Sequence, residues 1–301
     1  MIKLLSIICT VVFVLILIWL RLERKIVPRE STVAFWRLSN TPLLKRIEGH
    51  IYGARTMLYL KMATSPRLLA LARGSESADS YHGKVLTGSD AAKLITIDRP
   101  VILTDLKHVV PYSRARDIVL SGQEIAVLQC PCRELKRDSC EPRDVCLVIG
   151  EPFASFVVDH QPEKARMISI DEALDIIYAE ERRGHIHTAW FKDAMHDRFY
   201  AICNCCPCCC LGMASFFRGT PRLAHSGYRP KIDYDSCEGC GRCIEVCPFI
   251  AMEIDDGDRT SIKLDKCMGC GLCVSHCSNG AISLELAPGK GIPLAMDLLQ
   301  D

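Results

Sequence analysis

The stretch YAICNCCPCCCLGM carries six cysteines within eight residues: Cys203, Cys205, Cys206, Cys208, Cys209 and Cys210. Four more precede it in CPCRELKRDSCEPRDVC: Cys130, Cys132, Cys140 and Cys146. Neighbouring side chains of an extended segment point to opposite faces, so the run of six is predicted to divide into two sets. Unless Pro207 bends the run, Cys203 and Cys205 share one face, and the other face carries Cys206, Cys208 and Cys210.

The C-terminal part of the chain is an internal repeat with a period of 30 residues. IDYDSCEGCGRCIEVCPFIAMEI and IKLDKCMGCGLCVSHCSNGAISL each carry C-x2-C-x2-C-x3-C, so that Cys237 falls on Cys267. Four thiolates are the ligands of an iron–sulfur cubane, and the short glycine-containing turns let three of them wrap one cluster. A structural zinc ribbon is the alternative, but two C-x2-C pairs would suffice for zinc and half of these cysteines would have no purpose.

Residues 231–286 closely resemble the bacterial two-[4Fe-4S] ferredoxin family. The resemblance implies that the fourth cysteine of each repeat ligates the cluster of the other repeat. One cluster would be held by Cys237, Cys240, Cys243 and Cys277, and the other by Cys267, Cys270, Cys273 and Cys247. Pro248 follows Cys247 as the family expects, whereas Ser278 replaces the second proline. That replacement bears on the geometry and potential of the first cluster.

All ten upstream cysteines are candidate metal ligands. They suffice for two further [4Fe-4S] clusters with two thiols to spare, or for one unusually ligated cluster with several free thiols. A zinc or free-thiol site with a structural role is the alternative. Iron–sulfur chemistry is favoured because the neighbouring repeat already requires it. With its two cysteine-rich segments ahead of the repeat, the chain resembles membrane-associated ferredoxin-like proteins of anaerobic bacteria, which implies no defined reaction.

Two other residue types near these cysteines could serve a metal site. Arg133 could donate N–H groups to cluster sulfurs and raise the potential, although an ion pair is its commoner role. Three histidines precede or follow in sequence, and each is predicted to pack rather than to ligate: His185, His187 and His196. The sequence contains no P-loop, dinucleotide-binding glycine motif or hydrolase nucleophile elbow.

The 19 cysteines would be disulfides in a secreted chain and metal ligands in the cytoplasm. Residues 4–20 form an uncharged apolar run of about the minimum length for a bilayer span. No cleavage site follows, so an uncleaved anchor is favoured over a signal peptide. Positive charges follow this run, which predicts a single-pass protein of the cytoplasmic membrane with its soluble body on the cytoplasmic side. Cys9 lies within the anchor.

The chain has 301 residues, and a charged content of 24% with 49% hydrophobic residues is typical of folded proteins. The net charge of +1 gives no indication of nucleic-acid binding. From residue 231 onward, however, 6 Lys and Arg stand against 12 Asp and Glu. This acidic module is therefore predicted to be a docking surface for a redox partner protein.

The positioning elements are predicted from residue patterns. Residues 41–73 read as an amphipathic helix that packs on its own domain or lies on the inner leaflet. Strands are expected at 93–103, 124–130, 185–191 and 199–203, with helices at 112–120 and 169–184. The second helix opens with the capping box Ser169-Ile170-Asp171-Glu172. Two strands end directly in cysteine clusters, which places the ligands on rigid elements.

The predicted fold class is α+β, with an N-terminal transmembrane helix, a small α/β cysteine-rich domain and a ferredoxin-like domain that holds two [4Fe-4S] clusters. The domains are residues 1–25 (anchor), 26–80 (amphipathic membrane-proximal segment and linker), 81–230 (cysteine-rich metal-binding domain) and 231–301 (ferredoxin domain and tail).

Three functions follow from these patterns. The first is membrane-anchored electron transfer through several clusters to or from a partner oxidoreductase, as a carrier or a subunit of a complex. The second is a reductase with a catalytic, unusually ligated cluster at the upstream cysteines. The third is metal delivery or redox sensing.

Overall fold

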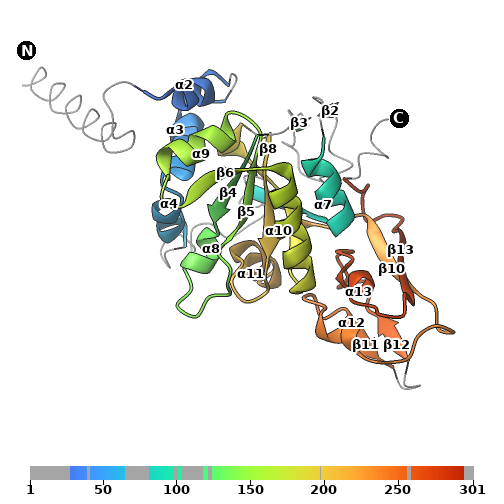
Figure 1. Cartoon of the computed structure of the whole chain (residues 1–301). Coiled ribbons are helices and arrows are strands. Elements are labelled where there is room, and N and C mark those ends of the chain that lie inside the picture. Colours follow the sequence, from blue (N-terminus) through green and yellow to red (C-terminus); the bar gives the residue numbers. More distant parts are fainter. Residues whose placement is uncertain are drawn as a thin grey trace, which may run out of the picture.

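The computed structural model describes residues 28–38, 41–64, 81–97, 101–103, 118–120, 124–196, 198–255 and 259–294. In this part of the chain, a body built on a seven-stranded sheet carries a smaller C-terminal module at one end, drawn orange to red in Figure 1. The cysteine-rich segments belong to the body, and the 30-residue repeat forms the module (residues 228–294).

The sheet of the body is almost wholly antiparallel. Its strand order is β6 (Ala165–Ile168), β4 (Ile125–Gln129), β5 (Asp144–Ile149), β8 (Arg198–Cys205), β7 (Ile186–Lys192), β1 (Tyr81–Leu86) and β9 (Leu223–Ala224). Every pair is antiparallel except β1 with β9. A separate pair joins β2 (Val101–Leu103) to β3 (Ile118–Leu120). The α+β class is confirmed, and the sheet lacks the parallel crossovers that an α/β domain would have.

Helices cover both faces of the sheet, as the alternation of side chains along a strand requires. On β7, Trp190 points into one core and Phe191 into the other. The Trp190 face packs against α2 (Glu30–Arg37), α9 (Phe153–His160) and α11 (Leu211–Phe217). The opposite face packs against α7 (Gly88–Ile95) and α10 (Ile170–Arg182). The thiols lie on the Trp190 side.

The helix predictions have mixed outcomes. The capping box at Ser169 is confirmed, since its hydroxyl accepts the Glu172 N–H at the start of α10. The strand expected from residue 93 is wrong in its first part, because Thr87 caps a helix that runs through Ile95 and buries Leu94. The helix expected at 112–120 is wrong at its end, where residues 118–120 form β3.

Helices α3 (Leu43–Ala54) and α4 (Thr56–Ala63) lie against the body, which is the first of the two alternatives for the amphipathic segment. The Tyr52 hydroxyl lies 2.9 Å from that of Tyr200 on β8, and Gln161 donates to the Gly53 carbonyl at 2.7 Å. Residues 65–80, with the rest of the predicted helix and the linker, lie outside the described residues.

The predicted transmembrane helix and membrane location are not supported. Within the described ranges, every helix is too short or too polar to cross a bilayer. The run at 4–20 on which the prediction was based, with Cys9, lies outside those ranges. The fold class is therefore corrected to α+β without the predicted membrane span, and the predicted membrane location is withdrawn with it.

The C-terminal module contains two copies of a chelating loop followed by a short helix. β10 (Tyr228–Ile232) pairs with β13 (Ile282–Leu286), and β11 (Met252–Ile254) pairs with β12 (Thr260–Ile262). The helices α12 (Arg242–Glu245) and α13 (Leu272–Ser275) begin within the C-x2-C-x2-C motifs. The module contacts the body at the end of α10, where the His276 ring lies 3.3 Å from the Arg182 carbonyl oxygen.

Candidate metal centres

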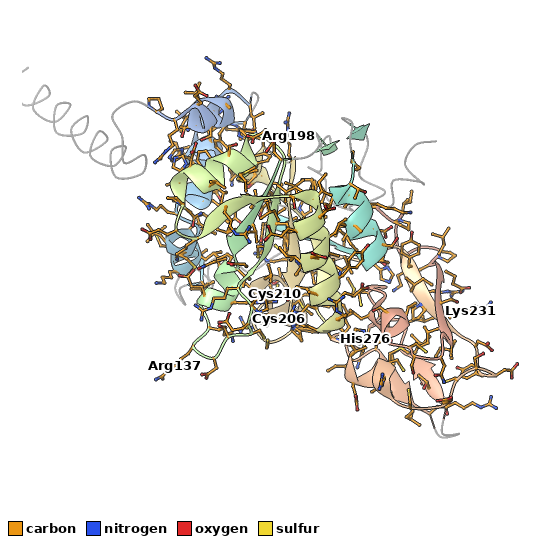
Figure 2. The ribbon with its side chains drawn as sticks, viewed as in Figure 1. Arg137, Arg198, Cys206, Cys210, Lys231 and His276 are labelled. Carbon is orange, nitrogen blue, oxygen red and sulfur yellow. The ribbon has the colours of Figure 1, made fainter. Side chains whose placement is uncertain are left out.

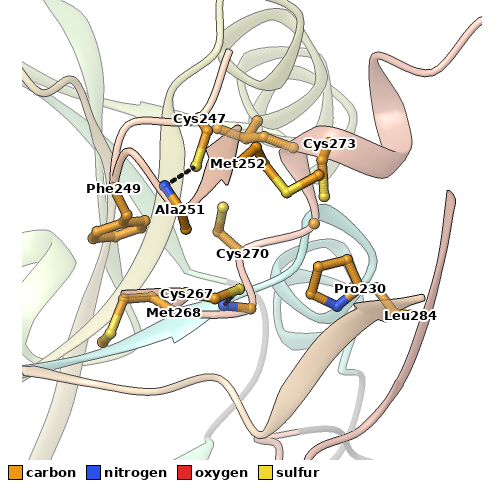
Figure 3. A pocket seen from close by; sticks show the side chains of 13 residues that line it. Pro230, Cys247, Phe249, Ala251, Met252, Cys267, Met268, Cys270, Cys273 and Leu284 are labelled. Carbon is orange, nitrogen blue, oxygen red and sulfur yellow. Dashed lines mark hydrogen bonds between the residues drawn. The ribbon is translucent and has the colours of Figure 1, made fainter. Parts of the chain in front are cut away.

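Four thiols of the C-terminal module surround one small cavity, shown in Figure 3. They belong to Cys247, Cys267, Cys270 and Cys273, which we term the inner quartet. The cavity measures about 20 Å³ and has a largely apolar lining that includes Phe249 and Leu272. Backbone N–H groups of Ala251 and Gly269 donate to the sulfurs of Cys247 and Cys267 at 3.3 and 3.4 Å. Convergent thiols with N–H donors to sulfur fit a cubane.

The fourth member of this quartet comes from the other repeat, as the family resemblance implies. Cys247 ends the first motif, whereas the other three belong to the second. Burial raises the pKa of Cys273 to about 12 and that of Cys270 above its ordinary range. Without a bound metal these thiols are therefore protonated, and metal binding must release their protons.

The remaining four cysteines of the module form the outer quartet: Cys237, Cys240, Cys243 and Cys277. The thiols of Cys237 and Cys240 are close enough to Cys243 to raise its pKa further, after the larger effect of its burial. Cys277 packs with Cys243 in the small core of the module. Cys240 is exposed, so this site opens to solvent on one side.

The ten upstream cysteines separate into two groups at one end of the sheet. Cys130 follows β4, Cys146 lies on β5, and Cys203 and Cys205 end β8. Residues 207–209 form a turn, after which Cys210 caps α11. Figure 2 shows Cys206 and Cys210 beside α11. The prediction that two strands end in cysteine clusters is confirmed.

One group, the surface tetrad, consists of four sulfurs that all lie within 4.8 Å of one another: Cys140, Cys206, Cys208 and Cys209. Among them, Cys208 lies 3.5 Å and Cys140 lies 3.9 Å from the Cys209 sulfur. Tetrahedral coordination with metal–sulfur bonds of about 2.3 Å places the sulfurs about 3.8 Å apart. The tetrad therefore fits a single metal ion.

The quartets of the C-terminal module provide an internal comparison for this spacing. Within the described part of the chain, the tetrad is the one group of three or more candidate ligands as close as 4.8 Å. In neither quartet do three sulfurs all lie within 4.8 Å of one another, so the tetrad has the narrower spacing.

The other six upstream thiols form a closed chain of contacts, which we term the thiol ring. Cys130 contacts Cys132 and Cys146, and Cys146 contacts Cys203. Cys205 contacts Cys203 and lies 3.2 Å from Cys210, which contacts Cys132 and so closes the ring. Its members are Cys130, Cys132, Cys146, Cys203, Cys205 and Cys210.

Each group contains thiols whose pKa is lowered, such as Cys130 and Cys209, and others whose pKa is raised. Within the ring, the Cys132 and Cys146 thiols, with the Arg133 backbone and charge, lower the pKa of Cys130 to about 3. In the tetrad, burial raises the pKa of Cys206 to about 11. The ring therefore contains a thiolate at neutral pH even before a metal binds, and a thiolate is the form that ligates.

The charged and imidazole side chains near the cysteines have structural roles. Arg133 is fully buried and donates to Glu180 at 2.5 Å, with the His185 ring nitrogen 3.1 Å away. It therefore makes a buried ion pair that ties the loop after β4 to α10. Among the described contacts its guanidinium donates to no sulfur, whereas its backbone N–H donates to the Cys130 sulfur. His187 shares a 2.6 Å hydrogen bond with Asn204, as the packing prediction expects. His196 bonds Thr41 at 2.8 Å.

Two features of the site escaped the sequence analysis. The alternation rule grouped Cys210 with Cys206 and Cys208, but the turn at 207–209 returns Cys210 to the side of Cys203 and Cys205. Thr188 was also missed, although its hydroxyl lies 3.3 Å from the Cys205 sulfur. Its place opposite Cys203 on the neighbouring strand β7 is a matter of register that no local motif reports.

Comparison with known proteins bears on the C-terminal module. Residues 229–278 match the family described as a 4Fe-4S dicluster domain. Over 31 residues, 10% of this chain, the sequence is 45% identical to Ferredoxin-2 of Desulfomicrobium norvegicum and 48% identical to Ferredoxin-3 of Desulfocurvibacter africanus. The matched part covers 52% and 51% of these relatives, about half of their length.

The module is a ferredoxin-type segment that binds iron–sulfur clusters. This confirms the predicted resemblance for residues 229–278. Iron–sulfur electron transfer is the chemistry that such a domain supports. The family match begins at residue 229, so the ring and the tetrad of the body lie outside it.

Proposed function

We propose that this protein relays electrons between a partner protein, which docks at the outer quartet, and the thiol ring of the body, with the inner quartet as the intermediate station. The observation that carries the proposal is the unequal burial of the two quartets. Cys240 of the outer quartet is exposed, whereas Cys247, Cys267 and Cys270 of the inner quartet pack against the core that contains the ring.

The contact between the inner quartet and the ring runs through α11. Cys210 begins this helix, and Phe216 near its end packs against Phe249 with ring centroids 5.9 Å apart. Phe249 lines the cavity of the inner quartet. Seven helical residues span about 10 Å, so a short, rigid and apolar element joins the two sites. Cluster redox chemistry needs little movement of ligands, and fixed spacing is what a relay requires.

The partner that fits the outer quartet is a protein with a basic surface, since the module carries the acidic excess of the chain. In this relay each quartet holds one [4Fe-4S] cluster, with the ligands that the family resemblance implies. The surface tetrad holds a single metal ion with a structural role. The burial of the ring thiols argues against metal delivery, because transfer to a partner needs accessible ligands.

A redox titration of the anaerobically reconstituted protein, followed by EPR, tests the proposal. We expect two low-potential [4Fe-4S] signals from the quartets and a further signal from the ring, with more than about eight iron atoms per chain by four per cubane. A Cys240→Ser variant should slow reduction by a donor protein while the ring signal remains. Absence of both low-potential signals after reconstitution would contradict the relay.

A further inference from the structure

The thiol ring lies against a second cavity, which is separate from the cavity of the inner quartet. The cavity measures about 90 Å³ and is lined by all six ring cysteines, together with Cys206 and Cys209 of the tetrad. Three tyrosines line it as well, Tyr52 from α3, Tyr81 from β1 and Tyr200 from β8. Among the residues that line it, none is Asp, Glu, Lys, Arg or His.

The ring cavity is much larger than the cavity of the inner quartet. The inner quartet, which fits one cubane, surrounds about 20 Å³, and the ring cavity is more than four times larger. A water molecule requires about 10–15 Å³ on this measure. The ring thiols therefore face more empty space than the inner quartet does, and that space exceeds the volume of one water molecule.

The three hydroxyl groups form one hydrogen-bonded cluster at the cavity wall. The hydroxyls of Tyr52 and Tyr200 lie 2.9 Å apart, and Tyr81 contacts both. Trp190 stacks on the Tyr81 ring at 4.4 Å, which holds that ring in place. Burial raises the pKa of all three phenols above the ordinary value, so each is a donor at neutral pH. A hydroxyl can rotate to donate to a ligand that enters.

The described residues around the cavity offer no unpaired ammonium or carboxylate to a charged ligand, so an uncharged ligand is favoured. One cation beside the tyrosines is Lys192, whose ammonium lies 5.5 Å and 5.7 Å from the ring centroids of Tyr52 and Tyr81. It is held by Glu48 at 2.8 Å, so its charge is already paired. A free charge in this apolar cavity would lose its hydration without gaining a partner.

We propose that the ring thiols hold an iron–sulfur cluster with one iron open to this cavity, where a small uncharged molecule binds with its hydrogen-bond acceptor directed at the hydroxyls of Tyr52, Tyr81 and Tyr200. The inference deepens the proposed function by naming the class of molecule that meets the end of the relay, and it rests on that function for the source of electrons.

Carbon monoxide, a small uncharged ligand of reduced iron, is the probe that tests this site. The reconstituted full chain is reduced with dithionite, exposed to carbon monoxide, and examined by infrared and EPR spectroscopy. We expect a C–O stretching band and a change in the ring signal, with both quartet signals unchanged. In Tyr200→Phe the band should move to higher frequency at unchanged iron content, because the oxygen loses a donor.

Tyr178→Phe is the matched control, since Tyr178 is an exposed residue of α10, on the other face of the sheet, and should leave the band in place. No band in a chain with intact quartet signals overturns the open iron and leaves the relay standing. Absent quartet signals with the band present contradict the relay and support the site. A band that survives Cys205→Ser but is lost in Cys209→Ser assigns the open iron to the tetrad and overturns the proposal.

Discussion

The outer and inner quartets are built by the same motif and have the same local backbone, but they lie in different surroundings. Gly239 and Gly269, at equivalent positions of the two loops, have φ angles of 65° and 67°. A Cβ on Gly239 would meet no atom within 4 Å, whereas one on Gly269 would overlap the Tyr228 carbonyl oxygen and the Ser226 hydroxyl. One loop faces solvent and the other is enclosed by the strand that enters the module.

This difference teaches that a repeat can specify two equal chelating loops and still yield two unequal redox sites. The inequality is imposed by the body, because Met268 and Leu272 of the inner loop belong to the same apolar core as Trp190. A free two-repeat module would have no such direction. The direction of the proposed relay therefore depends on how the C-terminal module packs against the body.

The largest expected effect comes from Gly269→Ala. The substitution places alanine at a left-handed φ and makes its Cβ clash with the backbone of Tyr228. We therefore expect the free energy of unfolding to fall by about 3 kcal/mol or more. The inner cluster should be lost with it. Denaturant unfolding of the holoprotein and an iron count measure both effects.

Gly239→Ala is the control for that variant. It has the same φ cost and no clash, so we expect a loss of about 1 kcal/mol with both clusters retained. Equal destabilisation by the two substitutions would show that the packing of the two loops does not differ in the holoprotein.

The next effect concerns Lys84, a buried residue of β1 whose ammonium donates to the Ile292 carbonyl at 2.9 Å and so ties the module to the body. Burial lowers its pKa from 10.5 to about 7, partly opposed by Asp90. Between these values the unfolded chain binds the extra proton, so stability should rise with pH from about 7 to about 10. The slope should reach at most about 1.4 kcal/mol per pH unit.

In Lys84→Met this slope should flatten, as measured by denaturant unfolding at a series of pH values. Lys93→Met, on the last turn of α7, is a control that retains Lys84 and should keep the slope. A wild-type profile that is flat above pH 7 would argue against a neutral Lys84 at the interface.

A smaller effect is expected where the repeats differ in one backbone position. Ile250 has a φ of 54°, and its counterpart 30 residues later is Gly280 with a φ of 64°. Isoleucine is strained in this region, so Ile250→Gly should stabilise the holoprotein by about 0.5–1 kcal/mol after the entropy of the added glycine is subtracted. Gly280→Ile should destabilise it by about 1–2 kcal/mol. Thermal unfolding of the pair measures both, and a destabilising Ile250→Gly would contradict the strain.

The smallest effect is electrostatic and should distinguish the two clusters. The charge of Lys290 acts on the Cys267 thiol of the inner quartet. Because Lys290 is exposed, its interaction is worth about 0.2–1 kcal/mol, which is about 10–40 mV for one electron. Lys290→Gln should lower the reduction potential of the cluster in the inner quartet by this amount and leave that of the cluster in the outer quartet unchanged. Equal shifts of the two reduction potentials in an EPR titration would show that Lys290 does not act selectively on the inner quartet.

Much of the site could be predicted where the chemistry is local. The C-x2-C-x2-C-x3-C repeats were recognisable from spacing alone, and the cap at Ser169 from its own four residues. The grouping of Cys210 with Cys206 and Cys208 was predicted only for a run that Pro207 does not bend, and a turn at 207–209 interrupts the extended chain there. Local spacing also could not pair Cys132 with Cys210, which are 78 residues apart in the sequence and meet only through sheet packing.

The sequence by itself determined that this protein has a ferredoxin-type segment and ten thiols in the two cysteine-rich segments before it, because ligand type and short spacing are local properties of the chain. Only the tertiary structure decided how those thiols divide into a ring of six and a tetrad, and which quartet is enclosed. Both depend on contacts between segments far apart in sequence, where strand register and the burial of apolar side chains set the distances. The run CNCCPCCC therefore supplies three thiols to each upstream site, and the turn at Pro207 separates them.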